Sequence, residues 1–69
     1  MHTDESEDPV ELGVVTCLLE RPKAIMVGLD NRPVWIPKSV LHDNSEVFRL
    51  SDNGKLIVKY WWADKEGYV

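Results

Sequence analysis

Residues 24–37 read AIMVGLDNRPVWIP, and this stretch decides the fold. Its first half, residues 24–30, alternates Ile, Val and Leu with other residues, which is the period-two pattern of a β-strand with one buried face. The DNRP at 30–33 is a turn signal, because Asn tolerates positive φ and Pro interrupts regular structure. The VWI at 34–36 returns as a second strand. The stretch therefore predicts an antiparallel hairpin.

The residues before this hairpin predict a strand that is apolar on both faces. Residues 12–20 read LGVVTCLLE and are rich in β-branched and aliphatic side chains. Such a strand either bends through a barrel or presents one face to another surface. Of the two alternating sets, one is Val15, Cys17 and Leu19, and the other is Leu12, Val14, Thr16 and Leu18.

The residues after the hairpin predict more strands and a terminal helix. Asn-Gly near position 53 is typical of a hairpin turn. Residues 60–68, YWWADKEGY, fit a helix of about two turns that ends at Gly67. Between the hairpin and this helix we expect a helical or 3₁₀ turn at 38–41, a loop at 42–45, a fourth strand at 46–50, a turn at 51–54 and a fifth strand at 55–59.

Short, closely spaced strands of this kind predict a mainly β fold. We expect a small, strongly bent antiparallel barrel of about five strands with a short C-terminal helix. An SH3-like arrangement is the first choice, with an OB-like barrel or an open sheet behind it.

The charge of the chain divides it into two parts. The 69 residues carry a net charge of −4, from 12 acidic and 8 basic side chains, and residues 1–11 hold five of the acids and no Lys or Arg. We therefore expect residues 1–11 to be an acidic, disordered tail and residues 12–69 to form one domain of about +1. The tail is either a solubilising leader or a phosphate mimic that binds a basic partner.

Composition also excludes several classes of protein. No apolar run is long enough to span a bilayer, and the acidic N-terminus does not resemble a signal peptide. The single cysteine, Cys17, is expected to be buried and unreactive, and it suits a reducing cytoplasm. Ser39, His42 and Asp43 lie in one short segment, so they do not form a catalytic triad. We expect no enzyme, no cofactor and no metal site.

The tryptophans and the second apolar face of residues 12–20 predict an interaction surface. Trp61 and Trp62 point in different directions on a helix, so we expect Trp35 and one of this pair in the core and the other as an exposed anchor. An outer patch containing Val14, Thr16, Leu18, Met26 and the second, exposed tryptophan would suit a partner or a homodimer. The candidate partner-binding residues are Trp61, Trp62, Met26, Trp35 and Lys38, together with Asp4, Glu5, Glu7 and Asp8 of the tail.

Two segments of the chain resemble a group of small, uncharacterised bacteriophage and prophage proteins. They are VWIPKS at 34–39 and WWADKEGY at 61–68, and the resemblance covers about residues 12–69. The group carries an apolar strand, a V-W-I-P-[KR]-S segment and a tail like W-[WL]-A-x-x-x-G-[LY], of which the VWIPKS segment is the more specific. The resemblance implies a phage origin and no established activity. Very small, acidic phage proteins often inhibit host systems by occluding a site, and anti-CRISPR proteins are a prominent class.

These observations predict a non-enzymatic, phage-type protein that binds and inhibits a host factor in the host bacterial cytoplasm. The most specific form is an anti-CRISPR protein that blocks a nucleic-acid-binding effector complex, so the partner would be a host protein or ribonucleoprotein. One alternative is a single-stranded nucleic-acid-binding module, against which the domain charge of only +1 argues. The other is a structural or accessory phage protein.

Overall fold

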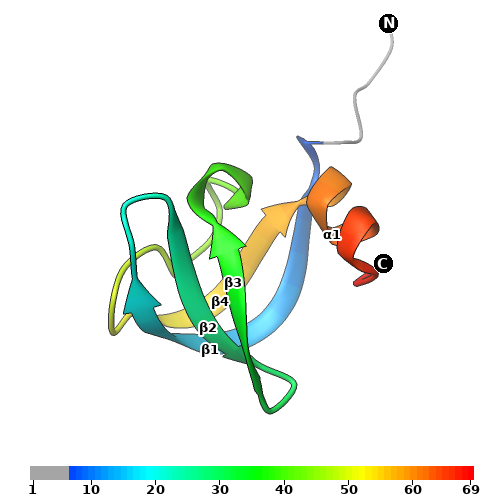
Figure 1. The fold of residues 1–69 in the computed structure, drawn as a ribbon. Helices are drawn as coiled ribbons and strands as arrows, with labels where there is room; N and C mark the ends of the chain where they lie inside the picture. The colour runs from blue at the N-terminus through cyan, green and yellow to red at the C-terminus, as the bar shows by residue number, and fades with distance from the viewer. Residues whose placement is uncertain (1–6) are drawn as a thin grey trace, which may run out of the picture.

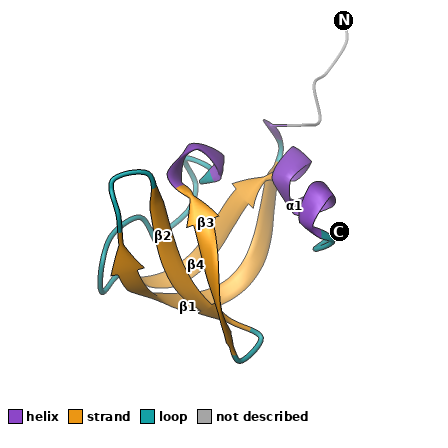
Figure 2. Cartoon of the chain, in the orientation of Figure 1, coloured by secondary structure: helices purple, strands orange, loops and turns teal. Residues whose placement is uncertain are grey.

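The computed structural model describes residues 7–69 (Figures 1 and 2). Within this range no helix is long and apolar enough to cross a membrane. In chain order the elements are β1 (Pro9–Glu20), β2 (Ala24–Leu29), β3 (Arg32–Pro37), the 3₁₀ turn η2 (Lys38–Val40), β4 (Asn53–Lys59) and α1 (Tyr60–Glu66).

The four strands form one antiparallel sheet in the order β3-β2-β1-β4. β1 is long and bent: its first part, as far as Thr16, pairs with β4, and its last part, from Cys17, pairs with β2 (Figure 1). Among residues 7–69 the edge strands β3 and β4 do not pair with each other, so the sheet is not closed. The mainly β fold with a short C-terminal helix is confirmed, whereas the five-stranded barrel, SH3-like or OB-like, is not.

The hairpin of β2 and β3 is confirmed, with a two-residue turn. Leu29 pairs with Arg32, and Asp30 and Asn31 between them have φ of 52° and 66°. Two positive φ values in succession are the geometry of a type I′ turn. Because the turn is this tight, β3 begins at Arg32, two residues before the predicted strand. The 3₁₀ turn predicted after Pro37 is present as η2.

The predicted strand at 46–50 is wrong, because these residues belong to an irregular segment between η2 and β4. The Asp52 carboxylate accepts hydrogen bonds from the backbone N–H groups of Phe48 (2.9 Å) and Arg49 (3.0 Å). A side chain that binds nearby N–H groups in this way competes with a strand ladder. We name residues 41–52 the covering segment.

The turn predicted at 51–54 lies earlier in the chain. The N–H of Asp52 donates to the carbonyl of Arg49, and Ser51 has a φ of 73°. Asn53 and Gly54 already belong to β4. The Asn-Gly signal therefore marks the start of a strand here, and the chain turns just before it.

β1 begins at Pro9, so the folded domain starts earlier than the predicted boundary at residue 12. Pro9 pairs with Lys59 and Glu11 with Ile57, so residues 9–11 lie in the sheet and not in the tail. The N–H of Tyr60, at the start of α1, donates to the carbonyl of Asp8 (2.9 Å). Asp4 and Glu5 lie outside the described residues, and so does the prediction made for them.

The core lies on the inner side of the bent sheet, where η2, α1 and the covering segment supply further side chains. Trp62 is 5% exposed and stacks on Tyr68, with ring centroids 5.7 Å apart. Cys17 is buried as predicted, and burial raises the pKa of its thiol. The buried apolar residues are Val15, Cys17, Ile25, Val27, Leu29, Ile36, Val40, Leu41, Val47, Leu56, Val58, Trp62 and Ala63.

Candidate protein-binding face

An irregularity in β1 turns two consecutive leucines to the outside of the sheet. Cys17 pairs with Val27, but the next pair along the ladder is Leu19 with Met26, so Leu18 is an additional residue in β1. Such a β-bulge breaks the strict in-and-out alternation of a strand. As a result both leucines are exposed, Leu18 by 48% and Leu19 by 39%.

The neighbouring strands extend this apolar surface. Met26 of β2 is half-buried and pairs with Trp35 of β3, which is 44% exposed. Successive residues of a strand point to opposite faces, and the neighbours of Met26 and Trp35, Ile25 and Ile36, lie in the core. Met26 and Trp35 therefore lie on the outer face. We name the outer surface formed by Leu18, Leu19, Met26 and Trp35 the leucine–tryptophan face.

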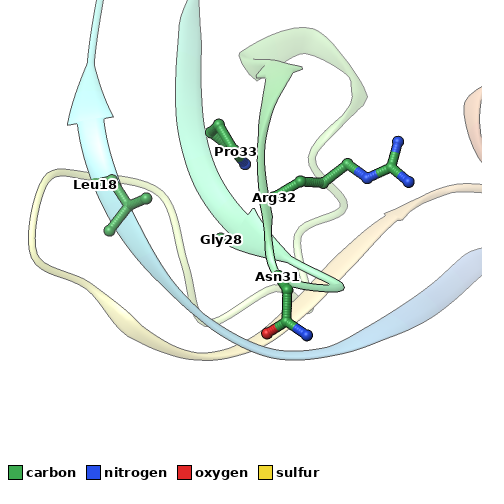
Figure 3. Close-up of a pocket in the computed structure, with 5 residues that line it drawn as sticks. All are labelled: Leu18, Gly28, Asn31, Arg32 and Pro33. Atoms are coloured by element: carbon green, nitrogen blue, oxygen red, sulfur yellow. The ribbon is translucent and has the colours of Figure 1, made fainter.

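A shallow depression of about 320 Å³ adjoins this face (Figure 3). Leu18 of β1, Gly28 of β2 and Pro33 of β3 line it across three strands, with Asn31 at the turn. A Cβ on Gly28 would lie 3.8 Å from Leu18 Cδ1, in ordinary van der Waals contact, so Leu18 reaches over β2 at this position. The Arg32 side chain points away from Leu18 in Figure 3.

One cation lies on the face itself. The Arg21 guanidinium lies over the Trp35 ring, 5.9 Å from the ring centroid, which is cation–π distance. Its Nη1 donates to the backbone carbonyl of Glu20 (3.1 Å), and it makes no ion pair within residues 7–69. Arg21 therefore presents an uncompensated positive charge beside the exposed tryptophan.

The free edge of β3, next to this face, has few hydrogen-bond donors. In an antiparallel pair of strands, hydrogen-bonded and non-hydrogen-bonded residue pairs alternate. The two-residue turn makes Leu29 and Arg32 a hydrogen-bonded pair, and the bond from Lys38 N–H to Lys23 carbonyl (2.8 Å) fits the same alternation at the other end of β3. The backbone groups of positions 33, 35 and 37 consequently point outward. Two of these positions are proline, so Trp35 has the one N–H among the three.

The free edge of β4 is occupied by the covering segment. His42 N–H donates to Ile57 carbonyl, and Ile57 N–H donates to the Ser45 hydroxyl. Lys55 carbonyl accepts from Glu46 N–H (2.9 Å), and Lys55 N–H donates to Glu46 Oε1 (2.8 Å). These bonds satisfy the outward backbone groups in the middle of β4, so a partner strand cannot pair there.

The tryptophans do not all lie where the sequence placed them. Trp62 is in the core, as predicted for one of the pair, and Trp61 on α1 is 40% exposed. Trp35 was expected in the core, and its exposure corrects that expectation. Trp61 belongs to α1, which packs against β1 and β4, so it is not part of the leucine–tryptophan face.

The charged candidates are engaged in contacts within the chain. Lys38 Nζ lies 2.8 Å from Glu20 Oε2, and the other oxygen of Glu20 accepts the N–H of Leu50 (3.2 Å). The Lys38 hydrogen bond is the main reason that the pKa of Glu20 is lowered. Glu7 of the tail lies 3.1 Å from Lys59 Nζ. None of these charged groups joins the leucine–tryptophan face.

Leu19, like Trp35, is a member of the face that the sequence placed in the core. Strict alternation from Cys17 assigns it to the core, and no residue type at 17–19 signals a bulge. The other bulge of β1, between Glu11 and Gly13, does carry a signal, because Gly13 has a φ of 121°, which favours glycine. That bulge turns Leu12 toward the core, although it was placed in the outer set.

The histidine among residues 7–69, His42, has a local structural role. His42 Nδ1 accepts the N–H of Asn44 (3.0 Å) and so closes a turn. Within residues 7–69 no three His, Cys, Asp or Glu side chains are grouped to hold a metal ion. No protein-family profile, curated protein or solved structure matches the chain.

Proposed function

We propose that this chain is a non-enzymatic protein-binding module and that the leucine–tryptophan face is its contact surface. The observation that carries the proposal is the exposure of Leu18, Leu19 and Trp35 together on the outer face of the sheet. A 69-residue chain has little core to spare, and adjacent apolar side chains left in water are typical of an interaction site. Tryptophan is also the residue most enriched at binding hot spots.

The resemblance to small phage proteins suggests what kind of partner the chain binds and to what effect. The partner would be a host protein or ribonucleoprotein in the bacterial cytoplasm, and binding would inhibit it by steric occlusion. The most specific version is an anti-CRISPR protein that covers a nucleic-acid-binding effector complex. In a strain whose CRISPR system targets a phage, expression of the chain should then restore plaque counts to the level of a strain without that system.

The contact surface can be tested by capture of host proteins from a bacterial lysate. Wild-type chain should retain a defined partner, and Leu18→Glu and Trp35→Ala should each lose it while their circular dichroism stays unchanged. Trp61→Ala is the matched control, because it removes an equally exposed tryptophan from another element. Retention of the partner by both face variants would refute the proposed surface, and a loss confined to Trp61→Ala would assign the contact to α1.

A further inference from the structure

The shape of the partner follows from the edges of the sheet. A strand that extends a sheet needs a regular row of donors and acceptors on an edge strand. β3 has a single outward N–H, at Trp35, and the middle of β4 is already bound by the covering segment. A partner that lies on the leucine–tryptophan face therefore finds no row of free backbone groups on β3 or in the middle of β4, and it contacts the face through side chains. An α-helix laid on a sheet is the common layer packing that buries such an apolar face.

The charge of the partner follows from the residues around the face. The segment 21–38, which contains β2 and β3, holds four basic side chains and one acid, Asp30. The rest of the chain holds eleven acids and four bases. Within residues 21–38, Lys38 is paired with Glu20, and Arg32 extends away from Leu18 (Figure 3). The positive charge beside the face therefore comes from the exposed Arg21 and Lys23. Arg21, over the Trp35 ring, makes no ion pair within residues 7–69. Charge complementarity favours carboxylates on the partner.

The same positive charge would also attract a nucleic acid, but the face suits one poorly. Single-stranded nucleic acid binds by stacking its bases on aromatic side chains. The leucine–tryptophan face has one aromatic residue among aliphatic ones, and the Trp35 ring already has Arg21 over it. Leu18 and Leu19 offer apolar packing and no stacking surface.

We infer that the leucine–tryptophan face binds an amphipathic α-helix of a partner protein, with the helix's apolar stripe on Leu18, Leu19 and Trp35 and its flanking carboxylates toward Arg21. This inference rests on the proposed protein-binding function and adds the chemistry of the partner.

Two synthetic helical peptides test the inference. Both carry leucines at positions i, i+3, i+4 and i+7, and one has glutamates on the flanks while the other has lysines at the same positions. Each is titrated into the ¹⁵N-labelled full chain at low salt, and backbone and indole N–H shifts are followed by NMR. The acidic peptide should shift Leu18, Leu19 and Trp35 and bind at least about tenfold more tightly than the basic one. Raising the salt concentration should reduce this difference.

Charge variants of the chain supply the control. Arg21→Glu with Lys23→Glu should remove the preference for the acidic peptide or reverse it, because it replaces two exposed positive charges by negative ones. Unchanged circular dichroism checks that the variant is folded. Lys65→Glu makes the same kind of change on α1 and should leave the preference intact. Leu18→Glu should abolish the shifts at Trp35 with either peptide.

Each remaining outcome overturns the inference in a different way. Equal or tighter binding of the basic peptide refutes an acidic partner. Larger Trp35 shifts with a dT₁₀ oligonucleotide than with the acidic peptide assign the face to nucleic acid. Concentration-dependent dimerisation that Leu18→Glu removes assigns it to a second copy of the chain. If neither peptide binds while lysate capture still requires Leu18 and Trp35, the helix inference fails and the proposed function stands.

Discussion

At the scale of single residues, Gly54 lies against Glu46 with no room for a methyl group. A Cβ at position 54 would lie 2.6 Å from Glu46 Oε1 and 2.8 Å from Glu46 Cβ. Glu46 cannot turn away freely, because the same Oε1 accepts the N–H of Lys55. An added methyl group therefore forces either the loss of this hydrogen bond or a shift of the backbone.

We accordingly expect Gly54→Ala to lower the free energy of unfolding by about 1–3 kcal/mol, measured by urea denaturation. Gly28→Ala is the matched control, since its new Cβ would lie 3.8 Å from Leu18 Cδ1 in ordinary contact. The control should change stability by no more than about 0.5 kcal/mol. Equal losses in the two variants would show that close approach to Glu46 is not the cause.

Two carboxylates tie the covering segment to itself and to β1, and both have lowered pKa values. The pKa of Glu20 is lowered chiefly by the Lys38 hydrogen bond and then by Leu50 N–H, and the pKa of Asp52 by the N–H groups of Phe48 and Arg49. A carboxyl with a lower pKa in the folded protein stabilises the fold fully above its unfolded pKa. That stabilisation is lost as the pH falls through the folded pKa.

Stability should therefore decline with acid as these two groups protonate. We expect the free energy of unfolding to decrease once the pH falls below the ordinary pKa values, 4.5 for Glu and 3.8 for Asp. The Glu20→Gln, Asp52→Asn double variant should be less stable at pH 7 and lose less on acidification. If its pH profile runs parallel to that of the wild type, these carboxylates do not cause the acid sensitivity.

At the scale of elements, the covering segment depends on one buried hydroxyl. Ser45 Oγ accepts the N–H groups of Val47 (3.3 Å) and Ile57 (3.2 Å) and lies within donating distance of the Lys55 carbonyl (3.4 Å). Ser45→Ala leaves the N–H groups of Val47 and Ile57 without this acceptor, which costs about 1–3 kcal/mol. Ser39→Ala, at an exposed site, should be nearly neutral. Thermal melts of the two variants that coincide would contradict this role of Ser45.

The two tryptophans of α1 separate a structural role from a surface role. Trp62 is buried and stacks on Tyr68, so Trp62→Ala should cost about 3–5 kcal/mol, a large part of the stability of a small domain. Trp61→Ala should cost about 1 kcal/mol or less, because its side chain is exposed. Near-ultraviolet circular dichroism and urea denaturation measure both. A larger loss for Trp61→Ala would contradict the assignment.

The elements show which parts of the fold the sequence could predict. Asp30 and Asn31 determine the hairpin turn locally, and Gly67, with a φ of 84°, ends α1 at the predicted residue. The strand predicted at 46–50 failed because Asp52 binds the N–H groups of Phe48 and Arg49, a contact that alternation does not reveal.

The candidate site could be predicted only in part, for a similar reason. Leu18 and Met26 were placed on the outer face by alternation, and the structure brings Trp35 beside them. Leu19 joined them because the bulge at Leu18 shifts the register, and register depends on the pairing of two strands. The single sequence of β1 does not contain that information.

At the scale of the whole molecule, the N-terminal residues from Glu7 onward contact β4 and α1 and so belong to the folded domain. Residues 9–11 pair with β4, Glu7 lies 3.1 Å from Lys59, and Asp8 accepts the N–H of Tyr60. We expect deletion of residues 1–6 to leave Tm within a few degrees of the wild-type value. Deletion of residues 1–11 removes the start of the ladder and should lower Tm by roughly 10 °C or more, at about 4–8 °C per kcal/mol. Equal melting temperatures for the two truncations would contradict this division.

The prolines on the outer edge of β3 have a consequence for the protein at high concentration. Fibril growth by cross-β stacking requires that an exposed strand template the same strand of the next copy. β3 has Trp35 on its face, yet with Pro33 and Pro37 on its edge it offers a second copy only one backbone donor. The exposed Trp35 is thus carried by an edge strand that is a poor template for a second copy, so we expect the chain to resist aggregation through this edge at high concentration.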